Sequence, residues 1–298
     1  MFDAIIVGGS FAGLSTAIYL ARAQKSVCVI DQGRPRNRFT QASHGFFAND
    51  GANPKALIAT MREQVAAYGT VTFRDGEAVA ATGSKGAFGV TTSAGEVLEA
   101  RRIVLAFGIS DILPDIPGLA ERWGSTVIHC PYCHGHEFAG QRLGVLNLSP
   151  ASLHQGKMIP DWGPTTFLLN GSALSADDRA QLEARGVAIA TGRVTRLEGP
   201  SGGLSAAVLE TGEEVALDAL FVGPQWRLNS AIAEQLGCEL GEGPLGPLVS
   251  VDAMQQTSVP GVFAAGDIGR SAQNVTFACA DGVMAAMATH ASLLGDSA

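Results

Sequence analysis

The chain has few charged residues and few aromatic ones, and it has no extended basic run. Charged residues make up 16% of its 298 residues and aromatic residues 6%, whereas hydrophobic residues make up 46%. This balance is typical of a globular protein and excludes a disordered one. The formal net charge of −8 argues against nucleic acid as a partner. Uninterrupted apolar runs of about 18 residues are also missing, so we expect no membrane-spanning helix and no membrane partner.

Cysteine is scarce as well. Five cysteines form an odd set, unlike the disulfide framework of a secreted protein. Met1-Phe2-Asp3 leads directly into an apolar segment without a charged leader, so we expect no signal peptide and a cytoplasmic location. We expect Cys28, Cys238 and Cys279 to be small core residues.

Glycine, by contrast, is abundant, and it shapes the start of the chain. An apolar strand over 4–7 runs into Gly8-Gly9-Ser10-Phe11-Ala12-Gly13, and an apolar helix through residue 23 and a strand over 27–30 ending at Asp31 follow. Glycines allow a tight turn next to a pyrophosphate, and the helix N-terminus offers N–H groups to it. The order predicts a dinucleotide-binding βαβ unit, with Asp31 placed to accept hydrogen bonds from a ribose. Ser10 replaces the usual middle glycine.

The remaining pattern predicts an α/β fold with two nested Rossmann-like domains. Strands are expected at 103–107 and 259–265, with a closing helix at 274–293, and a segment with its own strands lies between them. We therefore expect a discontinuous first domain at 1–116 and 246–298, and a second domain inserted at 117–245.

Residues 129–137 read His-Cys-Pro-Tyr-Cys-His-Gly-His-Glu. Two thiols at a Cys-x-x-Cys spacing can close into a disulfide and so carry an electron pair, and neighbouring histidines can carry the protons. Three other interpretations remain: haem attachment at the Cys-x-x-Cys-His pattern, a zinc site and a purely structural cysteine pair. Haem attachment needs an exported protein, and the potential zinc ligands are crowded into one short run, so we expect no metal.

The chain resembles the low-molecular-weight thioredoxin reductase family of flavoproteins. The opening turn, the strand end at 106–108, the Cys130-x-x-Cys133 pair and Gly266-Asp267 follow the family's order. The resemblance implies bound FAD, a homodimer, Cys133 against the flavin and Cys130 exchanging with a substrate. The residue pattern and the resemblance together give these candidate cofactor-binding residues: Gly8, Ser10, Gly13, Asp31, Asn37, Gly108, Gly266, Asp267, Asn274 and Val275.

The inserted segment departs from the family where a thioredoxin reductase carries its second nucleotide fingerprint. The strand at 143–146 is followed by Asn147-Leu148-Ser149-Pro150-Ala151-Ser152, which contains no glycine. Pro150 removes a backbone N–H where a phosphate needs donors, and Pro160 ends the next helix early. The following strand ends at 169–171 without the arginine cluster that an NADPH enzyme uses. We expect no ordinary NADPH site, as in the subset of dithiol oxidases that form the disulfides of gliotoxin- and holomycin-type metabolites.

These observations predict an FAD-dependent thiol–disulfide oxidoreductase. In the favoured form, a dithiol, either a small molecule or a thioredoxin-like protein, reduces Cys130–Cys133, and the electrons pass through FAD to oxygen or another acceptor. His134 is the expected base, with His129 second and His136 third. The alternatives are a reductase driven by NAD(P)H at an atypical site or by ferredoxin, and a flavin-bound redox sensor. His44 is either a residue facing the flavin or an ordinary loop histidine, and Trp162 either lines a substrate cleft or packs.

Overall fold

The computed structural model describes residues 1–295. They form two compact units. The first unit comprises Met1–Arg38, Asn53–Ser110 and the residues from Trp226 onward, and the second comprises Phe39–Ala52 and Asp111–Gln225. Strands β7 (Ile109–Ile112) and β16 (Gln225–Leu228) pair with each other where the chain passes between the units.

A seven-stranded sheet forms the centre of the first unit. Its order is β3-β2-β1-β6-β5-β4, with β19 also paired to β6. The strands β1, β2, β3 and β19 run parallel to their neighbours, whereas β4, β5 and β6 form an antiparallel meander. Their bounds are Phe2–Val7 (β1), Val27–Asp31 (β2), Val71–Asp75 (β3), Ala78–Ser84 (β4), Ala87–Thr92 (β5), Val97–Leu105 (β6) and Val262–Ala264 (β19).

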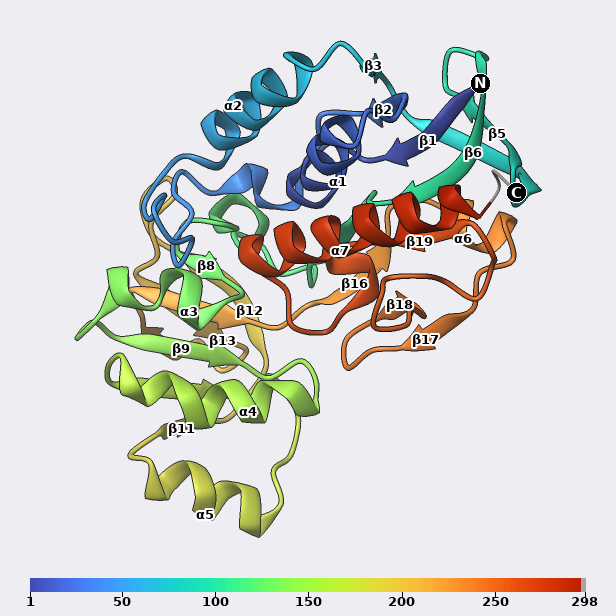
Figure 1. Cartoon of the computed structure of the whole chain (residues 1–298). Coiled ribbons are helices and arrows are strands. Elements are labelled where there is room, and N and C mark those ends of the chain that lie inside the picture. Colours follow the sequence, from blue (N-terminus) through green and yellow to red (C-terminus); the bar gives the residue numbers. More distant parts are fainter. Residues whose placement is uncertain (296–298) are drawn as a thin grey trace. The chain divides into compact units, whose positions relative to one another are not determined.

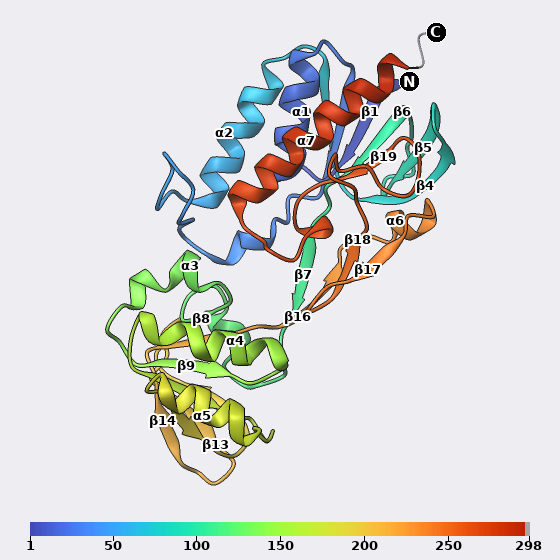
Figure 2. The same cartoon turned by 60° about the horizontal axis from the view of Figure 1, so that its bottom comes forward.

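Both faces of the parallel strands are buried, because alternate side chains enter two different cores. On one face Ala4 and Ile6 of β1 pack under the helices α1 (Phe11–Arg22), α2 (Pro54–Ala66) and α7 (Val275–Leu294) (Figures 1 and 2). On the other face Ile5 and Val7 pack under α6, β17 and β18. These elements span Ile232–Gln235, Leu240–Glu242 and Pro247–Val249. A continuous apolar strand such as β1 is therefore the expected sequence for this position.

Within residues 1–295, α7 is the one helix whose length and hydropathy would suit a membrane span. This is weak evidence for a membrane, because a core helix of a globular protein passes the same test. α7 lies against α1, where a Cβ on Gly282 would come within 2.2 Å of the Ala12 carbonyl oxygen. It also carries the buried Asp281.

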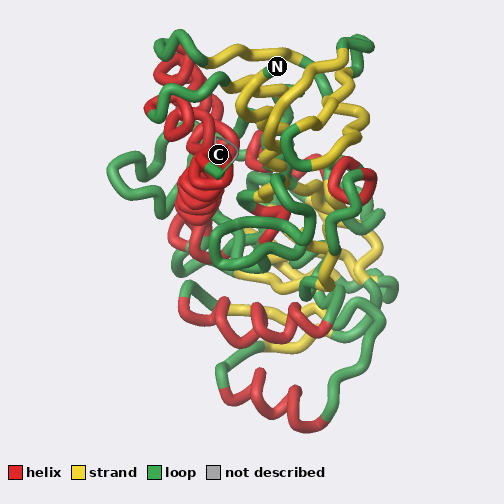
Figure 3. The backbone as a smooth tube through the Cα atoms, turned by 45° about the vertical axis from the view of Figure 1, so that its right-hand side comes forward, coloured by secondary structure: helices red, strands yellow, loops and turns green. Residues whose placement is uncertain are grey.

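The second unit contains a five-stranded parallel sheet in the order β11-β10-β9-β15-β8. Helices α4 and α5 cover one face, and the antiparallel sheet β12-β13-β14 covers the other (Figure 3). The strands are Val127–Ile128 (β8), Leu143–Leu146 (β9), Thr165–Leu168 (β10), Ala188–Ala190 (β11), Val194–Glu198 (β12), Ala206–Leu209 (β13), Glu214–Ala216 (β14) and Ala219–Val222 (β15). The helices are Pro131–His134 (α3), Pro150–Met158 (α4) and Ala176–Ala184 (α5).

Five 3-10 turns complete the described chain. They span Arg36–Phe39 (η1), Ala120–Arg122 (η2), His136–Phe138 (η3), Ile159–Asp161 (η4) and Asp267–Gly269 (η5). The turn η4 follows α4 directly and contains Pro160, which explains why α4 ends at Met158.

The α/β class and the pair of Rossmann-like units agree with the sequence analysis. The units divide the chain differently from the expected domains in three places, residues 39–52, residues 111–116 and residues 226–245. Trp226, Ile232 and Ala233 enter the core of the first unit, so the chain returns to it earlier than residue 246. Residues 39–52 belong to the second unit, although they lie between two elements of the first.

Candidate functional site

The redox pair lies at the N-terminus of the short helix α3. Cys130 is the N-cap residue, and Pro131 follows at the first helical position, where a missing N–H costs nothing. Cys130 and Cys133 are joined in a disulfide, with their Cα atoms 5.3 Å apart. The Cys133 backbone N–H also donates to Cys130 Sγ at 3.2 Å. A thiolate formed at Cys130 would therefore receive a backbone hydrogen bond, which favours the reactive form.

His129 connects the end of β8 to this helix. Its Nδ1 lies 3.2 Å from the carbonyl oxygen of Val222 in β15. The Gln155 side chain, from α4, donates to the His129 carbonyl oxygen at 2.9 Å. Both contacts fix the backbone that leads into Cys130. The geometry thus gives His129 a place beside the disulfide and ties its ring to the sheet.

His134 is the last residue of α3 and follows Cys133 directly. Its side chain is partly buried, and this burial lowers the pKa of the imidazole below its ordinary value of 6.5. The Glu137 carboxylate raises that pKa and His44 lowers it further, but both effects are smaller than burial. The ring is therefore neutral at neutral pH and able to accept a proton. His136, the third histidine of the motif, begins η3 and is exposed.

His44 lies next to this motif within the second unit. Its Nε2 is 3.4 Å from Glu137 Oε1, its Nδ1 is 3.6 Å from Asp50 Oδ1, and its ring packs edge-on to that of His134 at 6.2 Å between centroids. The sequence left His44 as either a residue facing the flavin or an ordinary loop residue. The structure brings it to the redox motif and adds Glu137, which sequence reasoning missed.

Trp162 packs against the same turn. A Cβ on Gly135 would meet the Trp162 ring at 2.9 Å, and the Tyr132 ring contacts Trp162 edge-on at 5.8 Å. A glycine is therefore required at position 135, directly after His134. The contact gives Trp162 a packing role beside the redox helix.

The first unit forms a glycine cradle between β1 and α1. Gly8 has φ +111°, and a Cβ there would lie 2.2 Å from the Ala106 carbonyl oxygen. A Cβ on Gly13 would lie 1.8 Å from the Gly8 carbonyl oxygen. Ser10 is the N-cap of α1, but its side chain does not cap the helix. The turn is thus closely packed from behind and presents the N-terminus of α1 to a ligand.

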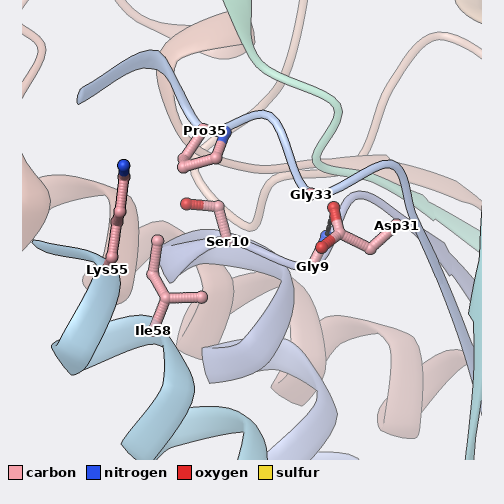
Figure 4. A pocket seen from close by; sticks show the side chains of 7 residues that line it. All are labelled: Gly9, Ser10, Asp31, Gly33, Pro35, Lys55 and Ile58. Atoms are coloured by element: carbon pink, nitrogen blue, oxygen red, sulfur yellow. Dashed lines mark hydrogen bonds between the residues drawn. The ribbon is translucent and has the colours of Figure 1, made fainter. Parts of the chain in front are cut away.

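A pocket opens at this cradle (Figure 4). Asp31 Oδ1 accepts a hydrogen bond from the Gly9 N–H at 3.1 Å, so the carboxylate lies at the turn, as expected for a ribose-binding residue. Lys55 and Ile58 reach the pocket from α2, and the sequence analysis did not identify either of them. The full lining is Gly9, Ser10, Asp31, Gly33, Pro35, Lys55 and Ile58.

The other candidate flavin residues of the first unit gather at η1, η5 and the start of α7. Arg36 donates to Asp267 Oδ2 at 3.2 Å and to Gln273 Oε1 at 2.6 Å. Asn274 is the N-cap of α7, and its side chain accepts from the Phe277 N–H at 2.7 Å. Val275 is then the first helical residue, so its N–H is not used by this cap.

The last three candidates lie in turns of the first unit. Gly266, with φ +82°, precedes η5, and Asn37 lies within η1. Gly108 has φ +69°, and its carbonyl oxygen accepts from the Asn229 N–H at 3.2 Å. The Asn229 side chain also donates to the Phe107 carbonyl oxygen at 3.1 Å. Asn229, which the sequence did not single out, fixes this turn.

The corresponding turn of the second unit is closed. After β9, the Leu148 and Ser149 N–H groups donate to the Ser152 hydroxyl at 3.0 and 3.4 Å, and Ser152 is fully buried. Pro150 is the first residue of α4 and has no N–H. The Leu148 and Ser149 N–H groups are therefore occupied by the chain's own side chain, and position 150 has no N–H to offer a phosphate.

The remaining cysteines are not poised to react. Burial raises the pKa of the Cys28 thiol to about 11 and also raises those of Cys238 and Cys279. Across residues 1–295, no group of three or more His, Cys, Asp or Glu side chains is arranged to hold a metal ion.

A disulfide beside histidines in one Rossmann-like unit, with a dinucleotide cradle in the other, is the arrangement of a disulfide oxidoreductase that uses a bound dinucleotide cofactor. The chain belongs to the pyridine nucleotide-disulphide oxidoreductase family, whose model matches residues 2–143 and 168–282. It is similar to thioredoxin reductase tcpT of Claviceps purpurea, at 33% identity over 99% of this chain and 95% of the relative. Thioredoxin reductase sirT of Leptosphaeria maculans is 32% identical, with the same coverage.

Solved structures agree. An oxidoreductase from Agrobacterium tumefaciens superposes with a TM-score of 0.95 at 45% identity, covering 99% of both chains. The crystal structure of HlmI gives a TM-score of 0.94 at 36% identity, covering 99% of this chain and 93% of HlmI. The predicted resemblance to thioredoxin reductase-like flavoproteins is confirmed, and so are the enzyme class and the cofactor FAD. The cradle fits that cofactor. Gly8 and Gly13 leave room for a turn too tight for any side chain, and the Asp31 carboxylate lies at the same turn.

Proposed function

We propose that this protein is an NADPH-independent dithiol oxidase. The observation that carries the proposal is the closed turn after β9, where Ser152 accepts the Leu148 and Ser149 N–H groups and Pro150 offers none. The family match also omits residues 144–167, the segment that contains this turn. Both observations argue that the second nucleotide site has been lost, while the first cradle and the cysteine pair are retained.

FAD bound at the first cradle would accept an electron pair and deliver it to an acceptor. We assign its binding to the α1 N-terminus for the pyrophosphate, to Asp31 for the ribose, and to Asp267 and the α7 N-terminus for the flavin half. A helix N-terminus stabilises negative charge by about 0.3–1 kcal/mol at an exposed site. Asn274 caps α7 in this arrangement and leaves the Val275 N–H to face the cofactor.

The cysteines perform the thiol chemistry. A substrate thiolate attacks Cys130 Sγ, which breaks the Cys130–Cys133 bond and forms a mixed disulfide with the substrate. The second substrate thiolate then attacks the substrate sulfur that is bonded to Cys130, which breaks that bond, frees Cys130 as a thiolate and releases the cyclic or protein disulfide. Two electrons and two protons have then moved from the substrate to the protein. With molecular oxygen as the final acceptor, the net reaction converts a dithiol and O2 into a disulfide and hydrogen peroxide.

His134 serves as the proton acceptor in this scheme. It is adjacent to Cys133, and burial keeps its pKa low, so the neutral ring can take the proton that a thiol must lose. His129 is the second candidate, because its ring is held near Cys130 by the Val222 carbonyl. We also propose a homodimer in the cytoplasm, acting on a small-molecule dithiol or a thioredoxin-like protein.

Oxygen uptake tests this proposal. Purified yellow holoenzyme is mixed with dithiothreitol in air, without any nicotinamide nucleotide, and oxygen consumption and peroxide are followed together. We expect sustained uptake with one peroxide per dithiol oxidised, and no uptake in the Cys133→Ser variant. Uptake that stops after a single turnover would indicate a redox sensor. Uptake that requires NADPH or reduced ferredoxin would indicate a reductase and overturn the proposal.

A further inference from the structure

We propose that His44 and Glu137 form an opposed pair that sets the protonation of His134, with His44 as a positioning residue of the redox site. This inference rests on the role of His134 in the proposed function. It goes further in one respect, because it gives the segment 39–52 a part in the thiol chemistry.

His44 is held between two carboxylates. Its Nε2 is 3.4 Å from Glu137 Oε1 and its Nδ1 is 3.6 Å from Asp50 Oδ1, so each ring nitrogen faces an acid. The His44 side chain is 23% exposed, whereas Asp50 is 70% exposed. The two acids, on opposite sides of the ring, fix its position and orientation.

The segment that carries His44 is built to hold it there. The Ser43 N–H donates to the Ala52 carbonyl oxygen at 2.8 Å, which closes the segment at its base. The Gly45 N–H donates to Asp50 Oδ1 at 2.8 Å, so the acid that faces His44 is itself fixed. These contacts place the ring by backbone geometry as well as by charge.

His44 and Glu137 act on His134 with opposite signs. The His44 ring lies edge-on to the His134 ring at 6.2 Å, and Glu137 follows His134 in the next turn, η3. A charged His44 disfavours a second positive charge on His134, and the Glu137 carboxylate favours it. Three titratable side chains thus surround His44, namely Asp50, Glu137 and His134. The Cys130–Cys133 disulfide beside them does not titrate.

The arrangement suits a base that must gain and lose a proton in each cycle. His134 is sheltered from water, so its proton needs neighbours that can balance the charge. Glu137 and Asp50 are more exposed than His134, and each of them contacts His44, whose ring packs against that of His134. The pair therefore links the sheltered ring to groups in contact with solvent.

Titration of His134 by NMR tests the inference directly. Oxidised holoenzyme is labelled with ¹³C at the histidine ring Cε1 position, and the His134 signal is assigned from its loss in His134→Gln. We expect His44→Gln to raise the midpoint of the His134 titration and Glu137→Gln to lower it. His154→Gln, a change on α4, is the control and should leave the midpoint unchanged.

Opposite shifts are a result that a merely structural role would not produce. Shifts in the same direction, or no shift in either variant, would overturn the inference. Because the titration needs neither turnover nor an electron acceptor, it stands apart from the proposed function. The two failures are distinguishable. If the midpoints shift as expected in His44→Gln and Glu137→Gln, but His134→Gln is reduced by dithiothreitol at the wild-type rate, then His134 is not the base, whereas the effect of His44 and Glu137 on its protonation stands.

Discussion

Cys130 and Cys133 differ from the other cysteines in the element that carries them. Both begin or lie within the short helix α3 and are partly exposed, whereas Cys28 is a fully buried residue of β2. Burial raises the pKa of Cys28 to about 11, which keeps that thiol protonated and unreactive. The redox chemistry of the chain is thereby confined to one pair.

Alkylation checks this separation. After anaerobic reduction by a dithiol, we expect iodoacetamide at pH 8 to label Cys130 and Cys133 well before Cys28 and Cys238, because only thiolates react and burial suppresses them at the latter two. Peptide mass spectrometry over time gives the order. Early labelling of Cys28 in folded protein would contradict the assignment.

Replacing His134 tests the proton acceptor. We expect His134→Gln to slow flavin reduction by dithiothreitol about 100-fold or more, the range typical of a lost general base, while FAD stays bound. Anaerobic stopped-flow absorbance measures the rate, and His136→Gln is the matched control. An unchanged rate in His134→Gln would exclude this role.

The pH dependence of the wild-type rate follows from the same group. Its folded-state pKa is lowered below 6.5, so the neutral, accepting form persists to lower pH than in an ordinary histidine. We expect the plot of flavin-reduction rate against pH to have an acid limb with its midpoint below pH 6.5, where the rate falls as His134 becomes protonated. This limb should be absent in His134→Gln. A midpoint well above pH 6.5 would contradict the lowering of the His134 pKa by burial.

At the scale of elements, β1–α1 and β9–α4 are both strand–turn–helix units. They differ at the N-terminus of the helix. The turn before α1 is glycine-lined and its Ser10 side chain leaves the helix uncapped, whereas α4 starts with Pro150 and the turn before it is closed by Ser152. One N-terminus is left to a ligand, and the other is satisfied within the chain. In our proposal, this difference determines which unit binds a nucleotide.

Substituting Gly13 tests the first cradle. A Cβ there would lie 1.8 Å from the Gly8 carbonyl oxygen, so Gly13→Ala must push α1 away from the turn. We expect purified Gly13→Ala to retain little FAD, as judged by the ratio of flavin to protein absorbance. Gly69→Ala is the control, because a Cβ added at Gly69 would meet no other residue's atoms within 4 Å apart from its chain neighbours. It should keep the wild-type ratio.

Substituting Ser152 tests the closed turn. Ser152→Ala leaves the Leu148 and Ser149 N–H groups without their acceptor in a buried position, which should lower the free energy of unfolding by about 1–3 kcal/mol. Urea unfolding followed by far-UV circular dichroism measures the loss. Ser201→Ala, on an exposed turn, should change it little. Equal stability of the two variants would mean that Ser152 does not cap this turn.

Much of this could be predicted from the sequence, because local pattern determines it. The strand expected at 143–146 has the bounds of β9, and the closing helix expected at 274–293 lies within one residue of α7. The effects of the two prolines are also local: Pro150 begins α4, and Pro160 lies in the turn η4 that ends it. Other features depend on contacts between distant segments. No local pattern shows that residues 39–52 join the second unit, that His44 reaches Glu137, or that Lys55 reaches the pocket at Ser10.

At the scale of the whole molecule, the chain combines a unit that carries a dinucleotide cradle with an inserted unit that carries the redox disulfide and, in our proposal, has lost its nucleotide site. The family, the enzyme class and the cofactor follow from the comparisons. The direction of electron flow follows from our proposal, in which electrons enter through Cys130 from a dithiol. A reductase would instead receive them from NADPH at the turn before α4.

Anaerobic mixing separates these two directions most directly. Oxidised holoenzyme is mixed in turn with NADPH, NADH and dithiothreitol, and the flavin absorbance band is followed in a stopped-flow instrument. We predict rapid bleaching by dithiothreitol, its loss in Cys133→Ser, and no comparable bleaching by either nucleotide. Rapid bleaching by NADPH at micromolar concentration would contradict the account.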